Sequence, residues 1–107
     1  MRRRTVSERD LRHEIERWAT TLHVSPRGVQ IRRMTRKWAS CSSNGRLTFS
    51  RDLLKQHTAF RDAVIVHELL HLRIPNHGKL FRSLMRAHVP GWDAAIRCGR
   101  PERVDRT

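Results

Sequence analysis

The 107-residue sequence predicts a single α+β domain over residues 1–107, with an N-terminal helix, a small antiparallel sheet of about three strands and several later helices. Three observations lead to this fold class. Apolar residues recur at helical spacing in residues 7–22 and again from Ala59 onwards. Between these stretches, short segments alternate between apolar and polar residues. Within them, an Asn-Gly pair at residues 44–45 indicates a tight hairpin turn.

The first expected helix covers residues 7–22. Its apolar face is formed by residues three or four positions apart, namely Leu11, Ile15, Trp18 and Leu22. Ser7 is a favourable N-cap, and Asp10 three residues later completes the pattern of a capping box. We therefore expect this helix to pack against a core, while residues 1–6 and 99–107 form flexible ends.

Three short strands are expected after this helix. Residues 28–34 alternate as a first strand, residues 36–42 form a second, and residues 47–49 form a third. The turn at residues 43–46 joins the second and third strands as a hairpin, and we expect the whole sheet to be antiparallel. The third strand could be the sheet edge that pairs with an extended peptide, although ordinary sheet formation explains its alternation equally well.

Helical segments are expected after the sheet, over residues 51–54, 59–73, 79–88 and 92–98. Ser50 should cap the first of them and Thr58 the second. Pro90 and Gly91 should separate the last two. The inward side of the third segment is predicted to carry Leu80, Phe81, Leu84, Met85 and His88.

Residues 67–71 read His-Glu-Leu-Leu-His and lie in the most apolar of these helices. Because positions i and i+4 share one helical face, His67 and His71 can direct two imidazoles at one metal ion. Pro75 cannot continue the helix, so the chain turns there and His77 can return to the same ion as a third ligand. Since neutral imidazole binds zinc well, at about 2.0–2.1 Å, the pattern predicts one zinc ion held by three histidines.

Glu68 lies beside the two histidines, about 60° around the helix from His71. That position is unsuited to a further ligand, but its carboxylate can reach a water molecule on the metal ion. Zinc with three protein ligands keeps a fourth position for water and lowers the pKa of that water to roughly 7. Glu68 would then act as general base and return the proton to the leaving group. The alternative is a core helix whose histidines bond to carbonyls, but it does not explain a charged residue in an apolar run.

The net charge of +13 is large for a chain of this size, and it favours nucleic acid, acidic proteins or anionic membrane surfaces as partners. Of the 23 basic residues 20 are arginine, a bias that GC-rich codon usage would also produce. The basic residues are spread along the chain, and no basic stripe is interleaved with aromatic residues that would stack on bases. The charge therefore leaves nucleic-acid binding open without establishing it.

Three features predict a cytoplasmic protein that does not enter a membrane. No apolar run is long enough to cross a bilayer. The basic start, Met1 to Arg4, is followed by polar residues rather than by the apolar stretch of a secretory signal. Two cysteines, Cys41 and Cys98, are too few for a disulfide framework. Cys41 could approach the metal ion as an inhibitory thiolate, but we expect it to be a small packing residue.

Three segments of the chain form a specific pattern, namely Trp38 to Thr48, Val66 to Leu72 and Pro75 to Phe81. Together they resemble the YgjP-like metallopeptidase family, which is related to the WLM and SprT-like zincins. That family has a Trp-Gly-Ser-Cys-Ser strand and hairpin, then His-Glu-Leu-x-His-Leu, then Asn-His before a Phe. Ala39 stands where the family usually has glycine. The resemblance covers roughly Val29 to Met85.

This resemblance implies a zincin-like α+β fold, a zinc-dependent metallopeptidase activity and a protein or peptide substrate. It implies that His67, His71 and His77 are the zinc ligands and that Glu68 is the catalytic base. Metzincins share the spacing of the three histidines, but they have glycine where this chain has Ile74, and no Met-turn is evident.

Three functional hypotheses follow. The favoured one is a zinc-dependent hydrolase of the peptidase type. The second attaches the same site to nucleic acid through the positive surface, so that it acts on DNA- or RNA-bound proteins as SprT-like relatives are thought to do. The third is a non-catalytic, zinc-stabilised binding module. Because the chain has no tyrosine, the candidates for a donor that stabilises an oxyanion are His57, Arg73, Asn76 and His88.

Overall fold

The computed structural model describes residues 5–97 and confirms the α+β class. Within this range the elements follow in the order α1 (Glu8–Leu22), β1 (Gly28–Arg32), β2 (Ala39–Cys41), β3 (Arg46–Ser50), η1 (Arg51–Lys55), α2 (Thr58–Leu70), α3 (Lys79–His88) and α4 (Trp92–Arg97). Of the flexible ends predicted at residues 1–6 and 99–107, residues 1–4 and 99–107 lie outside the described residues, as does Cys98, whereas Val6 donates its N–H to the carbonyl oxygen of Leu54 at 2.9 Å.

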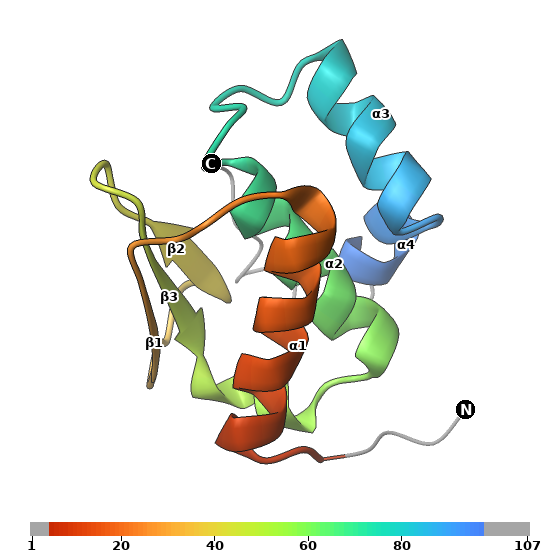
Figure 1. Cartoon of the computed structure of the whole chain (residues 1–107). Helices are drawn as coiled ribbons and strands as arrows, with labels where there is room; N and C mark the ends of the chain where they lie inside the picture. The colour runs from red at the N-terminus through yellow and green to blue at the C-terminus, as the bar shows by residue number, and fades with distance from the viewer. Residues whose placement is uncertain (1–4, 98–107) are drawn as a thin grey trace.

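The helix α2 is the centre of the molecule (Figure 1). It contacts α1, α3, α4 and the strand β2, so it is surrounded by the other elements. Ten consecutive or near-consecutive positions from Phe60 to Leu70 are buried, and they include three polar residues, Arg61, His67 and Glu68. The most apolar helix of the sequence therefore buries three ionisable side chains.

The sheet is mixed rather than antiparallel, which corrects the prediction. Its strand order is β1-β3-β2, with β1 parallel to β3 and β2 antiparallel to β3. The Asn-Gly turn specifies the β2–β3 hairpin, but the alternation of β1 specifies only which face is buried, because it reads the same in both directions. The loop between β1 and β2 carries the chain to the opposite edge of the sheet. Thr48 consequently pairs with Gln30 on one side and with Ser40 on the other.

This strand order also shows that the predicted edge strand was wrong. β3, which contains Leu47–Phe49, is paired on both sides and lies in the middle of the described sheet. The edges of that sheet are β1 and β2. Any partner that extends the sheet must therefore add to one of those two strands.

Several predicted boundaries shift by a few residues. β1 and β2 are shorter than expected, and α2 begins at Thr58 with His57 as N-cap. The hydroxyl of Thr58 instead accepts a hydrogen bond from Arg61 at 3.2 Å. α2 ends at Leu70 with His71 as C-cap, three residues before the predicted end. In α3, Phe81 and Met85 are buried as predicted, but Leu80 is 62% exposed.

The start of α1 is as predicted. The hydroxyl of Ser7 accepts the backbone N–H of Asp10 at 3.1 Å, and the Asp10 carboxylate accepts the backbone N–H of Ser7 at 3.2 Å. These two bonds form the capping box and fix the first turn. Leu11, Ile15 and Leu22 then face the core, where they pack beside α2.

A buried ion pair fastens α1 to α2. The Arg61 guanidinium donates to both carboxylate oxygens of Glu14 at 3.0 Å and also to the carbonyl oxygen of Gln56. The side chains of this pair are 3% and 13% exposed. Fork-to-fork pairing of this kind fixes both distance and orientation, so it holds the register of α2 against α1.

We predict that Glu14→Ala lowers the free energy of unfolding by about 3 kcal/mol, because it leaves the Arg61 charge buried without its partner. Chemical denaturation measures the change. The matched control is Glu8→Ala, whose ion pair with Arg51 is exposed and should contribute less than about 1 kcal/mol. Equal losses in the two variants would contradict the role of the buried pair.

A second contact between the same helices joins Trp18 to Asp62. The indole N–H of Trp18 donates to the Asp62 carboxylate at 3.0 Å. Burial raises the pKa of the Asp62 carboxyl above its ordinary value of 3.8, and the Trp18 hydrogen bond offsets part of that rise. The folded state thus holds this proton more tightly than the unfolded chain does, so the contribution of Asp62 to stability falls as pH rises from 3.8 through the folded-state pKa.

We predict that Asp62→Asn, which keeps an acceptor for Trp18, gains stability relative to the wild type as pH rises through that window. Above the window the difference should be constant. Denaturation curves at a series of pH values measure it, with Asp93→Asn on the exposed surface of α4 as the control for net charge. A difference that does not change with pH would show that the Asp62 proton is not linked to folding.

Candidate metal centre

The site is built at the C-terminal end of α2. His67 lies in the last turn of the helix and His71 is its C-cap, so the helical repeat places them on one face. Their ring centroids are 4.7 Å apart and the rings are nearly perpendicular. Both rings therefore approach one point beside the helix end.

The chain then reverses in a short loop. The N–H groups of Leu72 and Ile74 donate to the carbonyl oxygens of Leu69 and Leu70, which closes the helix end before Pro75. Asn76 next accepts the N–H of Gly78 through its side-chain oxygen at 3.0 Å. A Cβ atom at Gly78 would lie 2.9 Å from that oxygen, so a larger residue there would displace the Asn76 side chain.

The loop brings His77 back to the two helical histidines. The Nε2 atoms of His77 and His71 are 2.9 Å apart, and the ring centroids of His77 and His67 are 5.0 Å apart. Each of the three residues offers one ligand atom, and these atoms all lie within 4.8 Å of one another. The structure thus brings together the three residues that the sequence selected.

Hydrogen bonds orient two of the rings. Nδ1 of His71 lies 3.2 Å from the carbonyl oxygen of Ile74, which can only accept, so this bond requires the neutral tautomer with the proton on Nδ1 and a lone pair on Nε2. Nδ1 of His67 lies 3.2 Å from a carboxylate oxygen of Glu68. Donation to a carboxylate or carbonyl is the usual way in which metal-binding histidines are held in the correct tautomer.

Glu68 is the carboxylate that the sequence predicts beside the two histidines. Its side chain is 1% exposed, and it is surrounded by the apolar residues of α2 and the core. A carboxylate is buried at such a position only when nearby groups stabilise its charge. The imidazole of His67 is one such group, and a bound cation would be another.

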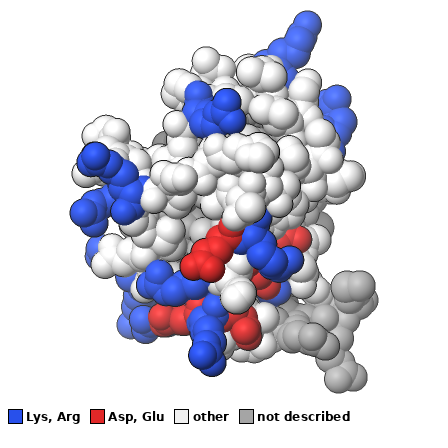
Figure 2. Space-filling view, in the orientation of Figure 1, with Lys and Arg blue, Asp and Glu red and all other residues white. Residues whose placement is uncertain are grey.

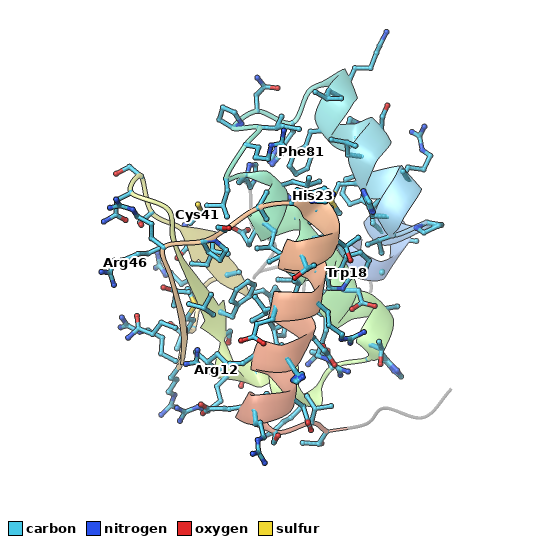
Figure 3. The ribbon with its side chains drawn as sticks, viewed as in Figure 1. Arg12, Trp18, His23, Cys41, Arg46 and Phe81 are labelled. Carbon is cyan, nitrogen blue, oxygen red and sulfur yellow. The ribbon has the colours of Figure 1, made fainter. Side chains whose placement is uncertain are left out.

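Phe81 is the residue whose role sequence reasoning missed. It lies in the first turn of α3, it is 1% exposed, and its ring contacts all three histidine rings. It stacks on His71 at a centroid distance of 4.9 Å and an angle of 26°. Figure 3 shows it beside the loop that carries His77. The sequence marked Phe81 as an inward residue, but only the fold shows that it forms a shared apolar platform for the histidines.

A cavity of about 330 Å³ reaches this cluster at His71. It is lined on one side by the end of β2 and the hairpin turn, from Cys41 to Gly45, and on the other by His71, Leu72 and Pro75. His67 is buried, His71 is partly buried and His77 is exposed, so the site opens towards His77. Cys41 is partly buried and packs against the core, as expected of a packing residue, while it also lines this cavity.

The predicted oxyanion donors are scattered. His57 caps the opposite end of α2, ten residues and about 15 Å of helical rise from His67, which rules it out. His88 packs edge-on against Trp18 at a centroid distance of 6.2 Å. Arg73 and Asn76 lie in the loop of the site and stay predictions.

A helix that presents His-Glu-x-x-His, followed by a returning histidine, is the arrangement of a metal-dependent hydrolase. Residues 2–97 match the family described as YgjP-like, metallopeptidase domain. This match spans most of the chain, so the protein belongs to the YgjP-like metallopeptidase family. It is accordingly a metallopeptidase, and its substrates are proteins or peptides.

Two solved structures share the fold. The chain is similar to the metallopeptidase zymogen jannalysin of Methanocaldococcus jannaschii, with a TM-score of 0.71, 21% identity, and coverage of 83% of this chain and 95% of that chain. It is also similar to the metallopeptidase zymogen abylysin of Pyrococcus abyssi, with a TM-score of 0.71, 17% identity, and coverage of 89% and 99%. A search of the curated proteins found no matching relative.

We predict that Phe81→Leu weakens binding of zinc by about 10-fold, because supporting groups around metal ligands typically contribute at this level or above. Competition with a chromophoric chelator measures the affinity. In the cobalt-substituted protein the visible absorption bands should also change, since they report ligand geometry. The control is Met85→Leu, one turn further along α3 and equally buried. If both variants lose the same affinity, the effect comes from core packing and not from the platform.

Proposed function

We propose that the chain is a zinc-dependent peptidase in which His67, His71 and His77 hold one zinc ion and Glu68 is the general base. The observation that supports this most directly is the convergence of three imidazole nitrogens beside a buried carboxylate. Family membership makes the protein a metallopeptidase. The residues and the ion are our proposal.

The donor set fits zinc better than harder ions. Imidazole suits zinc, whereas magnesium and calcium prefer oxygen ligands. Tetrahedral zinc with nitrogen ligands at about 2.0–2.1 Å would separate two ligand nitrogens by about 3.4 Å. The 2.9 Å between Nε2 of His71 and Nε2 of His77 needs only a small outward adjustment to reach that separation. When bound, zinc supplies a Lewis acid and lowers the pKa of a coordinated water to near 7.

In this proposal, Glu68 transfers the proton and Phe81 positions the imidazoles. Glu68 accepts the proton that the attacking water loses, and it donates that proton to the nitrogen of the departing amine, so the proton count balances over the cycle. Its burial keeps the carboxylate among few competing waters, which strengthens its electrostatic interactions. Phe81 limits rotation of the three imidazoles during both steps.

We propose that the substrate lies in extended form along β2. This strand is an edge of the described sheet, and its last residue, Cys41, lines the cavity that His71 also lines. An extended peptide can add to an edge strand through main-chain hydrogen bonds. This placement replaces the earlier expectation that Leu47–Phe49 would serve as the edge.

A nucleic-acid-associated form of this peptidase is a second candidate. It is favoured by the distribution of charge, because no acidic residue occurs between Glu16 and Asp52 or between Glu68 and Asp93. The first of these segments contains the sheet, and the second contains the loop of His77 and α3. Both walls of the cavity therefore come from segments without acidic residues.

None of the helices within residues 5–97 is both long enough and apolar enough to cross a membrane. We propose a cytoplasmic location, because two cysteines are too few for a disulfide framework.

Glu68→Gln separates a catalyst from a zinc-stabilised binding module. We predict that it keeps a near-stoichiometric zinc content but lowers peptide hydrolysis by at least about 100-fold. This is the lower end of the usual contribution of a general base. Elemental analysis and a quenched fluorescent peptide library measure the two properties. In parallel, His77→Ala should lose zinc. Unchanged hydrolysis in Glu68→Gln, or full zinc content in His77→Ala, would overturn the corresponding assignment.

A further inference from the structure

The charges of this protein are segregated along the chain. The segment between Glu16 and Asp52 has no acidic residue, and it contains eight basic residues, namely Arg17, Arg27, Arg32, Arg33, Arg36, Lys37, Arg46 and Arg51. By contrast, four of the ten acidic residues lie in the N-terminal part of α1. In the view of Figure 2, the acidic side chains accordingly gather over the lower half of the molecule, while the side that carries the sheet shows basic ones.

The basic segment forms a sheet with one open face. α1 and α2 lie on the same side of the sheet, and no other described element covers the opposite side (Figure 1). Strand alternation places Ile31, Leu47, Phe49 and Ala39 in the core. The outward positions define what we name the open sheet face, which consists of Gly28, Gln30, Arg32, Ser40, Arg46 and Thr48.

Arg46 lies over this face beside Gly28, its neighbour in β1. A Cβ atom at Gly28 would be 3.5 Å from a guanidinium nitrogen of Arg46, so the arginine side chain passes within van der Waals contact of this position. Figure 3 shows Arg46 on the side of the sheet away from the helices. Arg12 of α1 reaches the margin of the sheet, where it donates to the carbonyl oxygen of Val29 at 3.0 Å.

The open sheet face is hollowed, with a volume of about 580 Å³, and it is continuous with the metal cavity. Cys41 and Ser42 line both the hollow and the cavity that reaches His71. The lining of the hollow is mostly small or polar, with Val29 and Leu47 as its aliphatic residues, and it contains hydroxyl, amide and guanidinium groups. It contains no aromatic residue and no acidic residue.

We propose that the open sheet face binds the phosphodiester backbone of nucleic acid without reading its sequence. Arginine, serine, threonine, asparagine and glutamine are the side chains that contact phosphates in protein–nucleic acid complexes, and they are the ones present here. The lining offers no aromatic side chain on which bases could stack, which favours contact with the backbone as the mode of binding. The two arginines of this face, within a segment of eight basic residues and no acidic one, suit a polyanion with closely spaced phosphates better than a peptide with one or two carboxylates.

This inference deepens the nucleic-acid-associated form of the proposed function, and it does not depend on catalysis. A protein bound to nucleic acid would lie next to the cavity, because the hollow and the cavity share Cys41 and Ser42. The sheet would then act as an exosite that raises the local concentration of such substrates at the metal centre.

The test measures binding of the zinc-loaded full chain to a double-stranded DNA and a single-stranded RNA of mixed sequence at several salt concentrations. The test variant is Arg32→Gln/Arg46→Gln, which removes two charges from the open sheet face. The control variant is Arg82→Gln/Arg86→Gln, which removes two exposed charges from α3 and gives the same net charge. Thermal unfolding verifies that both variants are folded.

We expect the test variant to lose at least about 10-fold in affinity at low salt, and the slope of log affinity against log salt to fall by about 1.8 for two lost duplex phosphate contacts. The control variant should retain most of both. Equal losses of affinity in the two variants would show that binding depends on net charge alone, and they would overturn the proposal. So would absence of binding at low salt, or equal affinity for poly-glutamate, which would identify an acidic polypeptide as the partner. Peptide hydrolysis by the same samples reports separately on the proposed catalysis.

Discussion

The constraint on which this structure depends is the burial of ionisable groups in the last turn of its most apolar helix. His67 and Glu68 sit inside α2, where an uncompensated charge would be strongly unfavourable. Within residues 5–97, α2 contacts four neighbouring elements, and a cavity lies beside its C-terminal end at His71. The buried Arg61–Glu14 pair fixes the position of α2 against α1. Arg61 lies six residues before His67. The polar cluster is therefore rigidly placed before any ligand arrives, which is the condition for an effective active site.

The second half of the site comes from a loop, yet it is held almost as firmly. The side chain of Asn76 accepts the N–H of Gly78, and the ring of Phe81 packs against the histidines from α3. A loop between two anchored ends loses little further entropy when it binds an ion. The helix α3 thus matters to the centre although it contributes no ligand, because it carries the apolar surface against which the imidazoles rest.

The features that could be predicted from the sequence are those that depend on residues close together in the chain. The capping box at Ser7 and the hairpin at Asn44 and Gly45 could be predicted, since each depends on a few neighbouring residues. So could the three histidines, because helical repeat and Pro75 leave them one convergent arrangement. The direction of β1 relative to β3 could not be predicted, because an alternating pattern is the same in a parallel and an antiparallel strand. The contact of Phe81 with all three histidine rings and the exposure of Leu80 could not be predicted either. Those depend on how distant segments meet. The acid-free segment is visible in the sequence, but its meaning required knowing that one sheet face is uncovered.

The parallel pairing of β1 with β3 has a consequence for how the molecule assembles. The hairpin β2–β3 joins neighbouring residues and can close on its own, whereas β1 must wait until β3 exists, although it is made first. During synthesis, α1 and β1 leave the ribosome without their partners and stay exposed until the middle of the chain has emerged. The N-terminal third can therefore dock only after β3 and α2 have emerged, and a chaperone that shields nascent chains would encounter this protein there.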